Sequence, residues 1–510
     1  MKKSLILGSV ALLVIFGQAH ASSFTISSNS TTAQTLGSSS GQTGTVNSGK
    51  SLTVSGTTVA VTITGNNATL TNNGTISQTG SGRAVRDNTG VTGLTVTNNA
   101  GALMQTADAD VIQMNKTPAS VTLNNYGTMT SLNASKGGAQ AVDFNAILSG
   151  SNIINNYSTG IMQAQDADAV RPGVGGVVNN YGQILATHTT DTSDDGIDAQ
   201  NNSGVSVTNY STGSIEGARH GITGGAVDNT VTFTMGITNN AGGTIKGDNG
   251  SGVNIDGFNN KETVTISNDG TITGNGVTGD GDGVDVDGVV NITNTGTIKS
   301  INSFSATLPA QSEGVTVGGG TITNSGTIEG DVAAGNTNAV GRGITLAGID
   351  TTGTAEPIYA NSLVTNNNGG LIKGQTDSAI AVDGPASGFT VTVTNNAGAT
   401  IEGGGATAAA IRTGADNDTI NNSGTIQADA SGKAIDMGAG NNTLNILGGS
   451  ASIVGDVNGG AGGTNTATID PGTGHSFSFS NSFSNFASVL VKSGTVTLSG
   501  VSTYSGTTEV

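Results

Sequence analysis

Apolar and polar residues alternate in short runs along nearly the whole chain. A typical run is Val-Thr-Val-Thr at residues 391–394, and it leads to an Asn, then to a Gly, and then to an Ile, Leu or Met. Alternation with a period of two sends one set of side chains to each face of a strand, so each run predicts a β-strand. Beyond the first 20 residues no window keeps the spacing of an amphipathic helix. The pattern therefore predicts an all-β chain.

The phrase that contains the Asn recurs thirteen times between residues 72 and 422, a mean step of about 29 residues. A period in this range is typical of a solenoid or a stacked array. Asn and Gly tolerate the positive φ angles of sharp bends between strands. An Asn at the same bend of every coil can also bond the Asn above and below it, so we predict a structural Asn ladder. Its predicted members are Asn72, Asn99, Asn125, Asn156, Asn180, Asn209, Asn240, Asn268, Asn294, Asn324, Asn367, Asn396 and Asn422.

A second phrase follows each Asn phrase and reads Gly or Ala, then Val or Ile, then any residue, then usually an apolar one. Each repeat thus carries three strands: one before the Asn, one around the Ile, and one after the Gly or Ala. The three differ from one another, but each matches its counterpart one repeat later, so like strands are expected to stack in parallel. The predicted fold is a right-handed parallel β-helix (β-solenoid) of about 13 or more coils of about 29 residues, with three short strands per coil.

The two ends of the chain differ from the repeats. Met1-Lys2-Lys3, an apolar run over residues 5–16 and the triplet Ala-His-Ala at 19–21 have the order of a secretory signal peptide. Export through the Sec pathway is therefore expected, and the apolar run is too short to span a bilayer. The predicted organisation is a signal peptide at 1–21, an N-terminal cap and first coil at 22–60, a repetitive β-helix at 61–447 and a C-terminal β-helix end at 448–510.

Inserted segments lengthen some repeats. The largest step between successive predicted ladder residues runs from residue 324 to residue 367, and the inserts cover residues 299–312, 332–342 and 348–362. Loops that project from a solenoid are where recognition usually takes place. These segments are therefore the predicted positions of contacts with a ligand.

Composition narrows the function classes. The chain has no Cys and a net charge of −18; removing Lys2 and Lys3 with the signal peptide leaves 15 basic against 35 acidic residues, which is −20. Such an acidic surface argues against binding to nucleic acid or to anionic membranes. A long exported protein without disulfides is expected to be held together by its repeating coils. No phosphate-binding loop occurs, and we expect no cofactor.

The last 20 or so residues carry a specific motif. Lys492, residues 494–500 (Gly-Thr-Val-Thr-Leu-Ser-Gly) and residues 503–510 (Thr-Tyr-Ser-Gly-Thr-Thr-Glu-Val) resemble the passenger-associated repeat of bacterial autotransporters. Val496 stands where that repeat usually has Leu, and Ser502 where it usually has Asn. The resemblance implies a surface-exposed passenger domain of a Gram-negative bacterium, exported by type V secretion. Such a passenger is usually followed by an outer-membrane translocator barrel, whose strand and aromatic pattern these 510 residues lack, so the translocator is an expected partner.

Catalytic motifs are few. No Gly-x-Ser-x-Gly nucleophile context occurs. Asp194, Asp195 and His220 stand at the same phase of adjacent coils, which resembles polygalacturonases, β-helical enzymes that use an Asp pair and a Gly-His-Gly segment. Paired carboxylates could then act as acid and base in glycoside cleavage. The third and fourth motifs of that family are missing, so we expect no enzyme activity and keep these three residues as the alternative.

Four carboxylates lie close together in sequence, at Asp280, Asp282, Asp285 and Asp287. Carboxylate oxygens suit Ca²⁺. The EF-hand pattern fails because its spaced Glu is missing, and the Ca²⁺-binding nonapeptide fails because it does not recur. The four are interpreted as a solvated face, with a metal site as the alternative, and the acids that precede the Gly/Ala phase in several repeats are interpreted as a solvated acidic stripe. The stripe comprises Asp110, Asp168, Asp195, Asp282, Glu313 and Asp377.

These observations lead to one expected function and two alternatives. We expect a long rigid rod, at the cell surface or secreted, that acts as an adhesin or as a self-association protein in aggregation and biofilm. Its expected partners, besides the translocator, are a second copy of itself or a ligand on a host or cell surface. The alternatives are a polysaccharide-degrading β-helical enzyme and a scaffold that binds no specific ligand.

Overall fold

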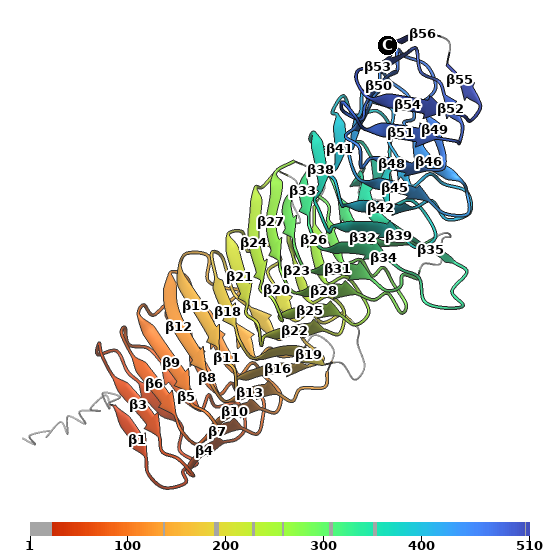
Figure 1. Cartoon of the computed structure of the whole chain (residues 1–510). Helices are drawn as coiled ribbons and strands as arrows, with labels where there is room; N and C mark the ends of the chain where they lie inside the picture. Colours follow the sequence, from red (N-terminus) through yellow and green to blue (C-terminus); the bar gives the residue numbers. More distant parts are fainter. Residues whose placement is uncertain are drawn as a thin grey trace, which may run out of the picture.

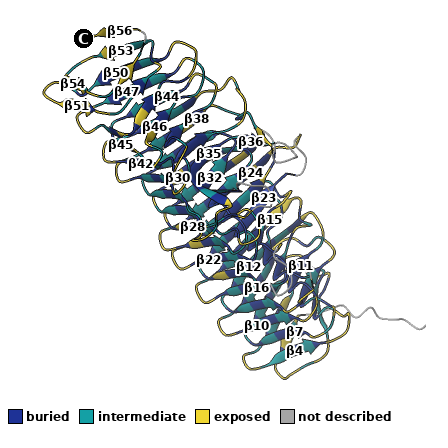
Figure 2. Cartoon of the chain, turned by 90° about the vertical axis from the view of Figure 1, so that its right-hand side faces the viewer, coloured by how far each residue is buried: buried dark blue, intermediate teal, exposed yellow. Residues whose placement is uncertain are grey.

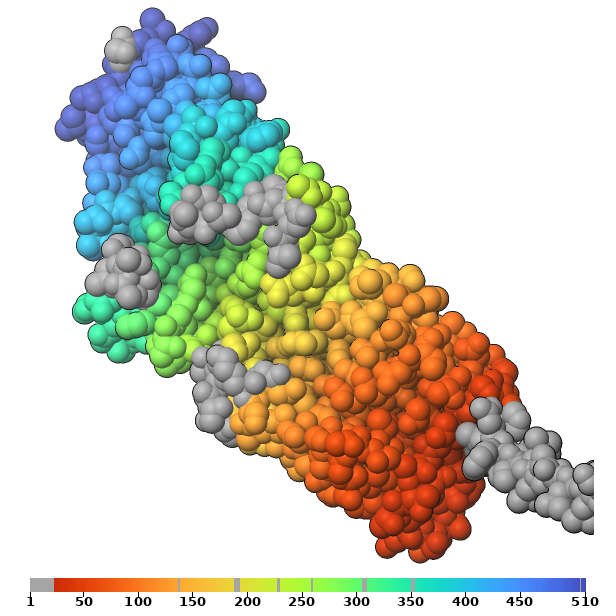
Figure 3. All heavy atoms as spheres, turned by 180° about the vertical axis from the view of Figure 1, so that it is seen from behind, coloured from red at the N-terminus to blue at the C-terminus, as the bar shows by residue number. Residues whose placement is uncertain are grey.

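The chain winds into one continuous parallel β-solenoid in the computed structural model (Figure 1). The structure describes residues 23–135, 138–187, 193–226, 230–257, 260–304, 310–349, 354–504 and 506–510. The signal peptide predicted at 1–21 lies outside these residues. Successive coils follow in chain order along a rod, as the colours of Figure 3 show. The parallel solenoid with three strands per coil is confirmed, with about 16 turns of ~27 residues.

Three parallel sheets run the length of the rod, and in each a strand pairs with its counterpart one coil away. Sheet A holds the strands that precede the Asn phrase. Its nineteen described strands are β1 (Phe24–Ile26), β3 (Thr43–Val46), β6 (Thr69–Asn72), β9 (Leu94–Asn98), β12 (Ala119–Asn125), β15 (Gly150–Asn156), β18 (Val177–Asn180), β21 (Val205–Asn209), β24 (Phe233–Asn239), β27 (Glu262–Asn268), β30 (Val289–Asn294), β33 (Gly320–Asn324), β38 (Ser362–Asn366), β41 (Val391–Asn395), β44 (Thr419–Asn422), β47 (Thr443–Leu447), β50 (Thr466–Asp470), β53 (Ser488–Val491) and β56 (Thr507–Glu509).

Sheet B holds the strands around the Ile of each repeat. Its fifteen described strands are β4 (Ser51–Val54), β7 (Thr75–Gln78), β10 (Leu103–Thr106), β13 (Thr128–Ser131), β16 (Ile161–Gln165), β19 (Gln183–Thr187), β22 (Ser214–Gly217), β25 (Thr244–Gly247), β28 (Thr271–Gly274), β31 (Thr297–Ser300), β34 (Thr327–Gly330), β39 (Leu371–Gly374), β42 (Thr400–Gly403), β45 (Thr425–Ala428) and β48 (Ser452–Val454). Near the C-terminal end, β51 (Ser476–Phe479) and β54 (Thr495–Leu498) form a separate parallel pair.

Sheet C holds the strands that follow the Gly/Ala phase. Its eighteen described strands are β2 (Gln34–Leu36), β5 (Val61–Ile63), β8 (Val85–Asp87), β11 (Ile112–Met114), β14 (Val142–Asp143), β17 (Val170–Arg171), β20 (Ile197–Asp198), β23 (Ile222–Gly225), β26 (Val253–Asp256), β29 (Val284–Val286), β32 (Ala310–Val317), β35 (Ala339–Leu346), β40 (Ile380–Val382), β43 (Ile411–Arg412), β46 (Lys433–Asp436), β49 (Asp456–Asn458), β52 (Phe483–Ser484) and β55 (Ser502–Thr503). The insert after β35 adds one antiparallel pair, β36 (Gly348–Ile349) and β37 (Ala355–Glu356).

Aliphatic side chains from all three sheets fill the inside of the rod. Leu70, Val96 and Leu123 stack in register on sheet A, and each is fully buried. Their Thr neighbours point outward, as the alternation of the sequence predicts. Figure 2 shows this arrangement, with buried residues along the strands and exposed residues gathered in the turns between them. The sequence-based count of coils is low because the Asn phrase is missing before residue 72 and after residue 422, where strands nevertheless continue.

An unbroken Asn ladder occupies the last position of thirteen successive sheet A strands. Each side-chain amide donates to the side-chain oxygen of the next Asn, over 2.8 to 3.1 Å. Val46 precedes the ladder in register and Ile446 follows it. Its members are Asn72, Asn98, Asn125, Asn156, Asn180, Asn209, Asn239, Asn268, Asn294, Asn324, Asn366, Asn395 and Asn422, all fully buried.

Four predicted ladder positions are wrong by one residue: Asn99, Asn240, Asn367 and Asn396 are half-buried neighbours of the true members. The prediction aligned the repeats on an Asn and took the second Asn of a pair in these four copies. In each of these copies the ladder Asn is followed by a second Asn, and four residues lie between the ladder Asn and the start of the sheet B strand, against two after Asn72. Backbone pairing sets the true register, because Asn98 lies opposite Asn72 and its side chain points inward.

Glycine at the bend before sheet C is required by close packing in the middle of the rod. A Cβ on Gly283 would lie 2.5 Å from the carbonyl oxygen of Gly314 and 2.8 Å from Cγ2 of Ile298. The equivalent position is Ala in outer coils, for example Ala379 and Ala410. The bend therefore brings sheet C against sheet B most tightly in the coils that carry Gly.

Aromatic rings extend the stacking outside the ladder. Tyr126, Tyr157, Tyr181 and Tyr210 each follow a ladder Asn, and their rings stack with centroid distances of 4.0, 6.2 and 3.8 Å. Near the C-terminal end four buried Phe rings form part of the core, at residues 477, 479, 483 and 486. The described part of the chain contains no helix that is long and apolar enough to cross a membrane.

Candidate functional site

Sheet C presents polar side chains outward in the middle of the rod. Backbone pairing places Asn254, Asp285, Thr316 and Thr345 side by side in four successive coils. The residues before and after them in each strand are buried aliphatics, so these four side chains point away from the core. We call this register position, followed through all coils, the outer column of sheet C.

A second line of polar side chains lies one residue before the Gly/Ala bend. In five coils the side chain accepts a hydrogen bond from the backbone N–H of its counterpart one coil later: Asp110 from Gln140, Asp168 from Asp195, Asp195 from His220, His220 from Ser251, and Asp282 from Glu313, over 2.8 to 3.1 Å. The bend interrupts the regular pairing of strands, so some backbone N–H groups have no backbone acceptor there. These side chains accept their hydrogen bonds instead.

The predicted acidic stripe exists in space, but its interpretation as a solvated face is wrong. Asp110, Asp168, Asp195, Asp282 and Glu313 are all buried. Their carboxylates bond backbone N–H groups or neighbouring side chains. Asp377, the sixth predicted member, is half-buried and pairs with Arg342 at 2.5 Å. The side chains of the stripe therefore help to hold successive coils together.

Asp195 and His220 lie in adjacent coils, as predicted. Each side chain accepts a hydrogen bond from a backbone N–H group and so stabilises the bend. Arg219 binds both carboxylate oxygens of Asp195, at 3.1 and 2.8 Å. Burial raises the pKa of Asp195 to about 7, although Arg219 opposes the shift. Nδ1 of His220 accepts a hydrogen bond from the N–H of Ser251, and burial followed by the charge of Arg219 lowers the pKa of His220 to about 3.

These contacts do not favour the polygalacturonase-like alternative. An acid–base pair for glycoside cleavage needs carboxyl groups that face a substrate. Asp195 is occupied by a guanidinium and a backbone N–H. Asp194 is also buried, with 3 % of its surface exposed, and its carbonyl oxygen accepts a hydrogen bond from the N–H of Arg219.

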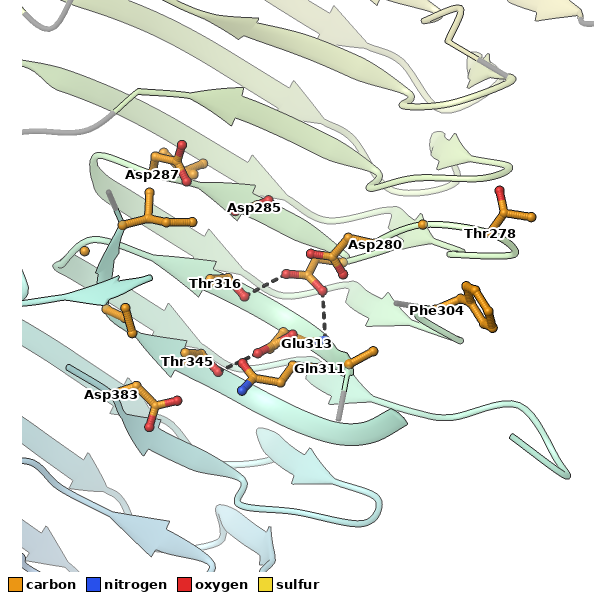
Figure 4. A pocket seen from close by; sticks show the side chains of 18 residues that line it. Thr278, Asp280, Asp285, Asp287, Phe304, Gln311, Glu313, Thr316, Thr345 and Asp383 are labelled. Carbon is orange, nitrogen blue, oxygen red and sulfur yellow. Dashed lines mark hydrogen bonds between the residues drawn. The ribbon is translucent and has the colours of Figure 1, made fainter. Parts of the chain in front are cut away.

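A cavity of about 740 Å³ opens on sheet C further along the rod (Figure 4). Strands β29, β32 and β35 form its floor. Phe304, Ala310 and Gln311 come from the predicted insert at 299–312, while Ile349 and Ala355 come from the insert at 348–362. The cavity therefore lies between two of the segments that the sequence marked for recognition.

Carboxylates surround this cavity. Oxygens of Asp280, Asp282 and Asp285 lie within 4.8 Å of one another. Asp280 accepts hydrogen bonds from the N–H of Gly281 and the hydroxyl of Ser303, both over 2.9 Å. Asp282 accepts from the N–H of Glu313 at 2.9 Å and the hydroxyl of Thr316 at 2.7 Å. The structure thus brings together three of the four predicted residues.

Asp287, the fourth, lines the same cavity beyond this cluster. Its carboxylate accepts a hydrogen bond from the N–H of Gly257 at 3.0 Å. Glu313 and Asp383 also line the cavity and come from the next coils. In Figure 4, Asp280, Asp285 and Glu313 surround the same opening, with Phe304 on one side and Asp383 on the other.

Crowding of these groups raises their pKa values. Burial raises the pKa of Asp282 and of Asp285 well above the usual range, and neighbouring carboxylates add to the shift. Burial also raises the pKa of Asp287 to about 7 and that of Glu313 to about 8. Asp280 is exposed to the cavity, but the walls around it restrict water, and its pKa is raised as well. Burial and mutual repulsion therefore favour the protonated forms of these carboxyl groups, and a bound cation would favour their charged forms.

Sequence reasoning missed the roles of Thr316, Phe304 and Asp383. Thr316 and Asp383 reach the cavity from later coils: the register of sheet C places Thr316 beside Asp285, and Asp383 lines the far side of the cavity. Glu313 was detectable, because it belongs to the predicted stripe at the phase next to Asp282. Phe304 carried no signal, since a single ring in an insert has no periodic counterpart.

Comparison of the chain with protein-family models, with curated proteins and with solved structures finds no match.

Proposed function

We propose that the chain is a rod-shaped, surface-exposed passenger of the autotransporter type that acts in adhesion. The signal-peptide pattern and the partial passenger-associated repeat support export to the cell surface. The observation that carries the proposal is the cavity between two inserts, placed near the middle of a long rod. A solenoid of stacked coils is stiff, so it would hold such a site away from the membrane, where a partner can reach it.

The proposed partners follow from this arrangement. A translocator domain would export the rod, and a ligand on another cell or a second copy of the rod would bind it. Self-association is the variant in which two rods meet along their sides. Outward-facing Thr and Asn side chains recur along sheet A, for example Thr95, Thr97 and Asn124, so many weak hydrogen bonds would add up along paired rods.

The test displays the full chain on the surface of a non-aggregating Gram-negative strain by fusion to a translocator domain. Cell sedimentation then measures self-association, and attachment to cultured host cells measures adhesion. We expect at least one of the two to rise above that of cells that display only the translocator. Surface display confirmed by antibody labelling, with neither sedimentation nor attachment changed, would contradict the proposal.

Two variants separate adhesion from the alternatives. Replacing residues 349–356 with a short Gly/Ser turn removes the β36–β37 pair from one side of the cavity. If attachment persists unchanged, the cavity is not the adhesion site, and a plain scaffold or side-by-side pairing becomes the better interpretation. If purified chain depolymerises acidic polysaccharides and Asp195→Asn abolishes this activity, the enzyme alternative replaces adhesion.

A further inference from the structure

Three aspartates in the outer column of sheet C have an arginine in register in an adjacent coil. Arg171 lies in register with Asp143 and bonds Asp198 at 3.2 Å. Arg412 lies in register with Asp436. Each of these three aspartates therefore has an arginine beside it in an adjacent coil of the same column, and Arg171–Asp198 is an ion pair of the kind that partly buried carboxylates favour.

Asp285 breaks this rule. Its neighbours in the column are Asn254 on one side and Thr316 on the other, and neither carries a charge. Beyond Thr316 the column continues with Thr345 and Ala381, which are also neutral. Within the described residues, no hydrogen bond or ion pair engages the side chain of Asp285, although burial and the nearby carboxylates disfavour its charge.

The cavity occupies the space that an arginine would fill in this column. Thr316 and Thr345 are short, so the volume of about 740 Å³ opens directly beside Asp285. Elsewhere on this face the chain supplies the guanidinium itself. Arg83 reaches Asp110 at 3.1 Å, Arg219 reaches Asp195 at 2.8 Å, and Arg342 reaches Asp383 at 2.7 Å.

We propose that this cavity binds the guanidinium group of an arginine side chain from a partner polypeptide. Both oxygens of Asp285 are available for a bidentate contact of the kind that guanidinium groups form with carboxylates. Asp280 lies close enough to Asp285 to share the cation. Phe304, with 42 % of its surface exposed at the side of the cavity, offers a ring face on which a guanidinium can stack.

A divalent metal fits the same carboxylates less well. Ca²⁺ takes about six to eight oxygen ligands. Both oxygens of Asp282 and one oxygen of Asp280 already accept hydrogen bonds from the protein. The cavity is also far larger than an ion and has apolar walls at Val286 and Ile349. Room for a side chain, an aromatic face and a carboxylate without a partner together favour an organic cation.

The proposal names the ligand of the adhesion site, and its biological meaning rests on the proposed function. Its chemistry can be tested without surface display. Purified chain, without residues 1–21, is titrated by calorimetry with the capped tripeptide Gly-Arg-Gly, and with Gly-citrulline-Gly, in which a neutral urea replaces the guanidinium. We expect the arginine peptide to bind at least about tenfold more tightly than the citrulline peptide.

Two substitutions locate the site. Asp285→Asn should weaken binding of the arginine peptide about tenfold or more, while Asp108→Asn, an exposed acid in a distant coil, should leave it unchanged. Thr316→Arg removes the hydroxyl donor to Asp282, but it places a guanidinium in register with Asp285 that can donate to both carboxylates, so it should abolish peptide binding and raise the melting temperature. The higher melting temperature keeps this test valid, because a misfolded variant would melt lower.

Several outcomes of these experiments would overturn the proposal. Equal binding of both peptides, binding that Asp285→Asn does not alter, or no binding at about 10 mM peptide would overturn the proposal. Binding of Ca²⁺ alone, lost in Asp285→Asn, with no response to either peptide, would overturn it in favour of a metal site. If the peptide binds as expected but displayed cells neither attach nor aggregate, the cavity chemistry stands and the adhesion function fails.

Discussion

The side-chain amide of Asn72 donates a hydrogen bond of 2.8 Å to the side-chain oxygen of Asn98, which lies 26 residues later in the chain. The same amide also bonds the carbonyl oxygen of Leu103, in the sheet B strand of the next coil. One side chain thus bonds both the ladder Asn and the sheet B strand of the next coil. Because the ladder is fully buried, each member depends on its neighbours for partners that water cannot replace.

The ladder predicts a sharp difference between two adjacent residues. Asn98→Ala removes one of the two acceptors of the Asn72 amide and the donor to the side-chain oxygen of Asn125, so we expect a loss of about 2–3 kcal/mol in the free energy of unfolding. Asn99→Ala removes a half-buried contact to Asn73 and should cost about 1 kcal/mol or less. Urea unfolding followed by circular dichroism measures both. Equal losses would mean that the ladder contributes no more than an ordinary surface contact.

The bend before sheet C predicts that Gly283 cannot be replaced. Gly283→Ala forces a methyl group against the carbonyl oxygen of Gly314, and we expect a cost of about 1–3 kcal/mol. Gly236 in β24 is the matched control, because a Cβ there would meet nothing within 4 Å. Gly236→Ala should be neutral or stabilise by about 0.5 kcal/mol, through the lower entropy of the unfolded chain. Thermal melts of the two variants decide the question, and a stable Gly283→Ala protein would show that the coils can separate at this bend.

His220 is predicted to act as a hydrogen-bond acceptor for the backbone. Its Nδ1 accepts from the N–H of Ser251, so His220→Ala should cost about 1–3 kcal/mol, and His220→Asn, which keeps an acceptor, should recover part of the loss. The pKa of His220 in the folded state is lowered to about 3, below the unfolded value of about 6.5. Its contribution is therefore fully present above about pH 6.5 and declines as the pH falls toward 3.

Nuclear magnetic resonance tests this assignment directly. The ring proton shifts of His220 should stay constant from pH 8 to about pH 4, because the ring remains neutral over that range. A titration midpoint near 6.5 would contradict the buried, acceptor role. Attachment and sedimentation of displayed cells should be the same for His220→Asn and the unaltered chain, whereas the enzyme alternative requires a loss of activity.

Buried carboxylates predict that the rod is less stable at high pH. Glu262 has 2 % of its surface exposed, and its Oε2 has no hydrogen-bond partner among the residues that the structure describes. Burial, with the charges of Asp287 and Asp256, raises its pKa to about 7, above the unfolded value of about 4.3. The folded state holds this proton more tightly than the unfolded state does, so the contribution of Glu262 to stability is fully present below about pH 4 and falls as the pH rises toward 7.

Glu262→Gln should remove part of this dependence. Between pH 5 and pH 8 we expect the variant to lose about 1–3 kcal/mol less unfolding free energy than the unaltered chain. Glu402→Gln provides the control, because Glu402 is half-buried and lies 3.9 Å from Lys373. Urea midpoints at four pH values are sufficient. A parallel pH profile for Glu262→Gln and the unaltered chain would show that this carboxylate ionises freely in the folded state.

Much of the architecture follows from the order of residues alone. Period-two alternation marked the strands, and a recurring phrase at a nearly constant step marked the coils, because each coil must repeat the inward apolar positions of the one before it. Asn72, Asn125 and Asn422 were placed correctly in the ladder for the same reason. The inserts around residues 299–312 and 348–362 were visible as departures from the repeat, and both line the cavity.

The tertiary structure determined the strand register and the neighbours of the polar side chains, which the repeat pattern does not contain. Backbone pairing chose Asn98 over Asn99, because turn length varies between coils while strand register does not. It turned a predicted solvated stripe into buried acceptors of backbone N–H groups, since hydrogen bonds between coils join residues about one period apart. It also set Asp285 between Asn254 and Thr316, away from any arginine of its column. The spacing of apolar residues along the chain determines the coil, and the stacking of coils determines which polar side chains meet.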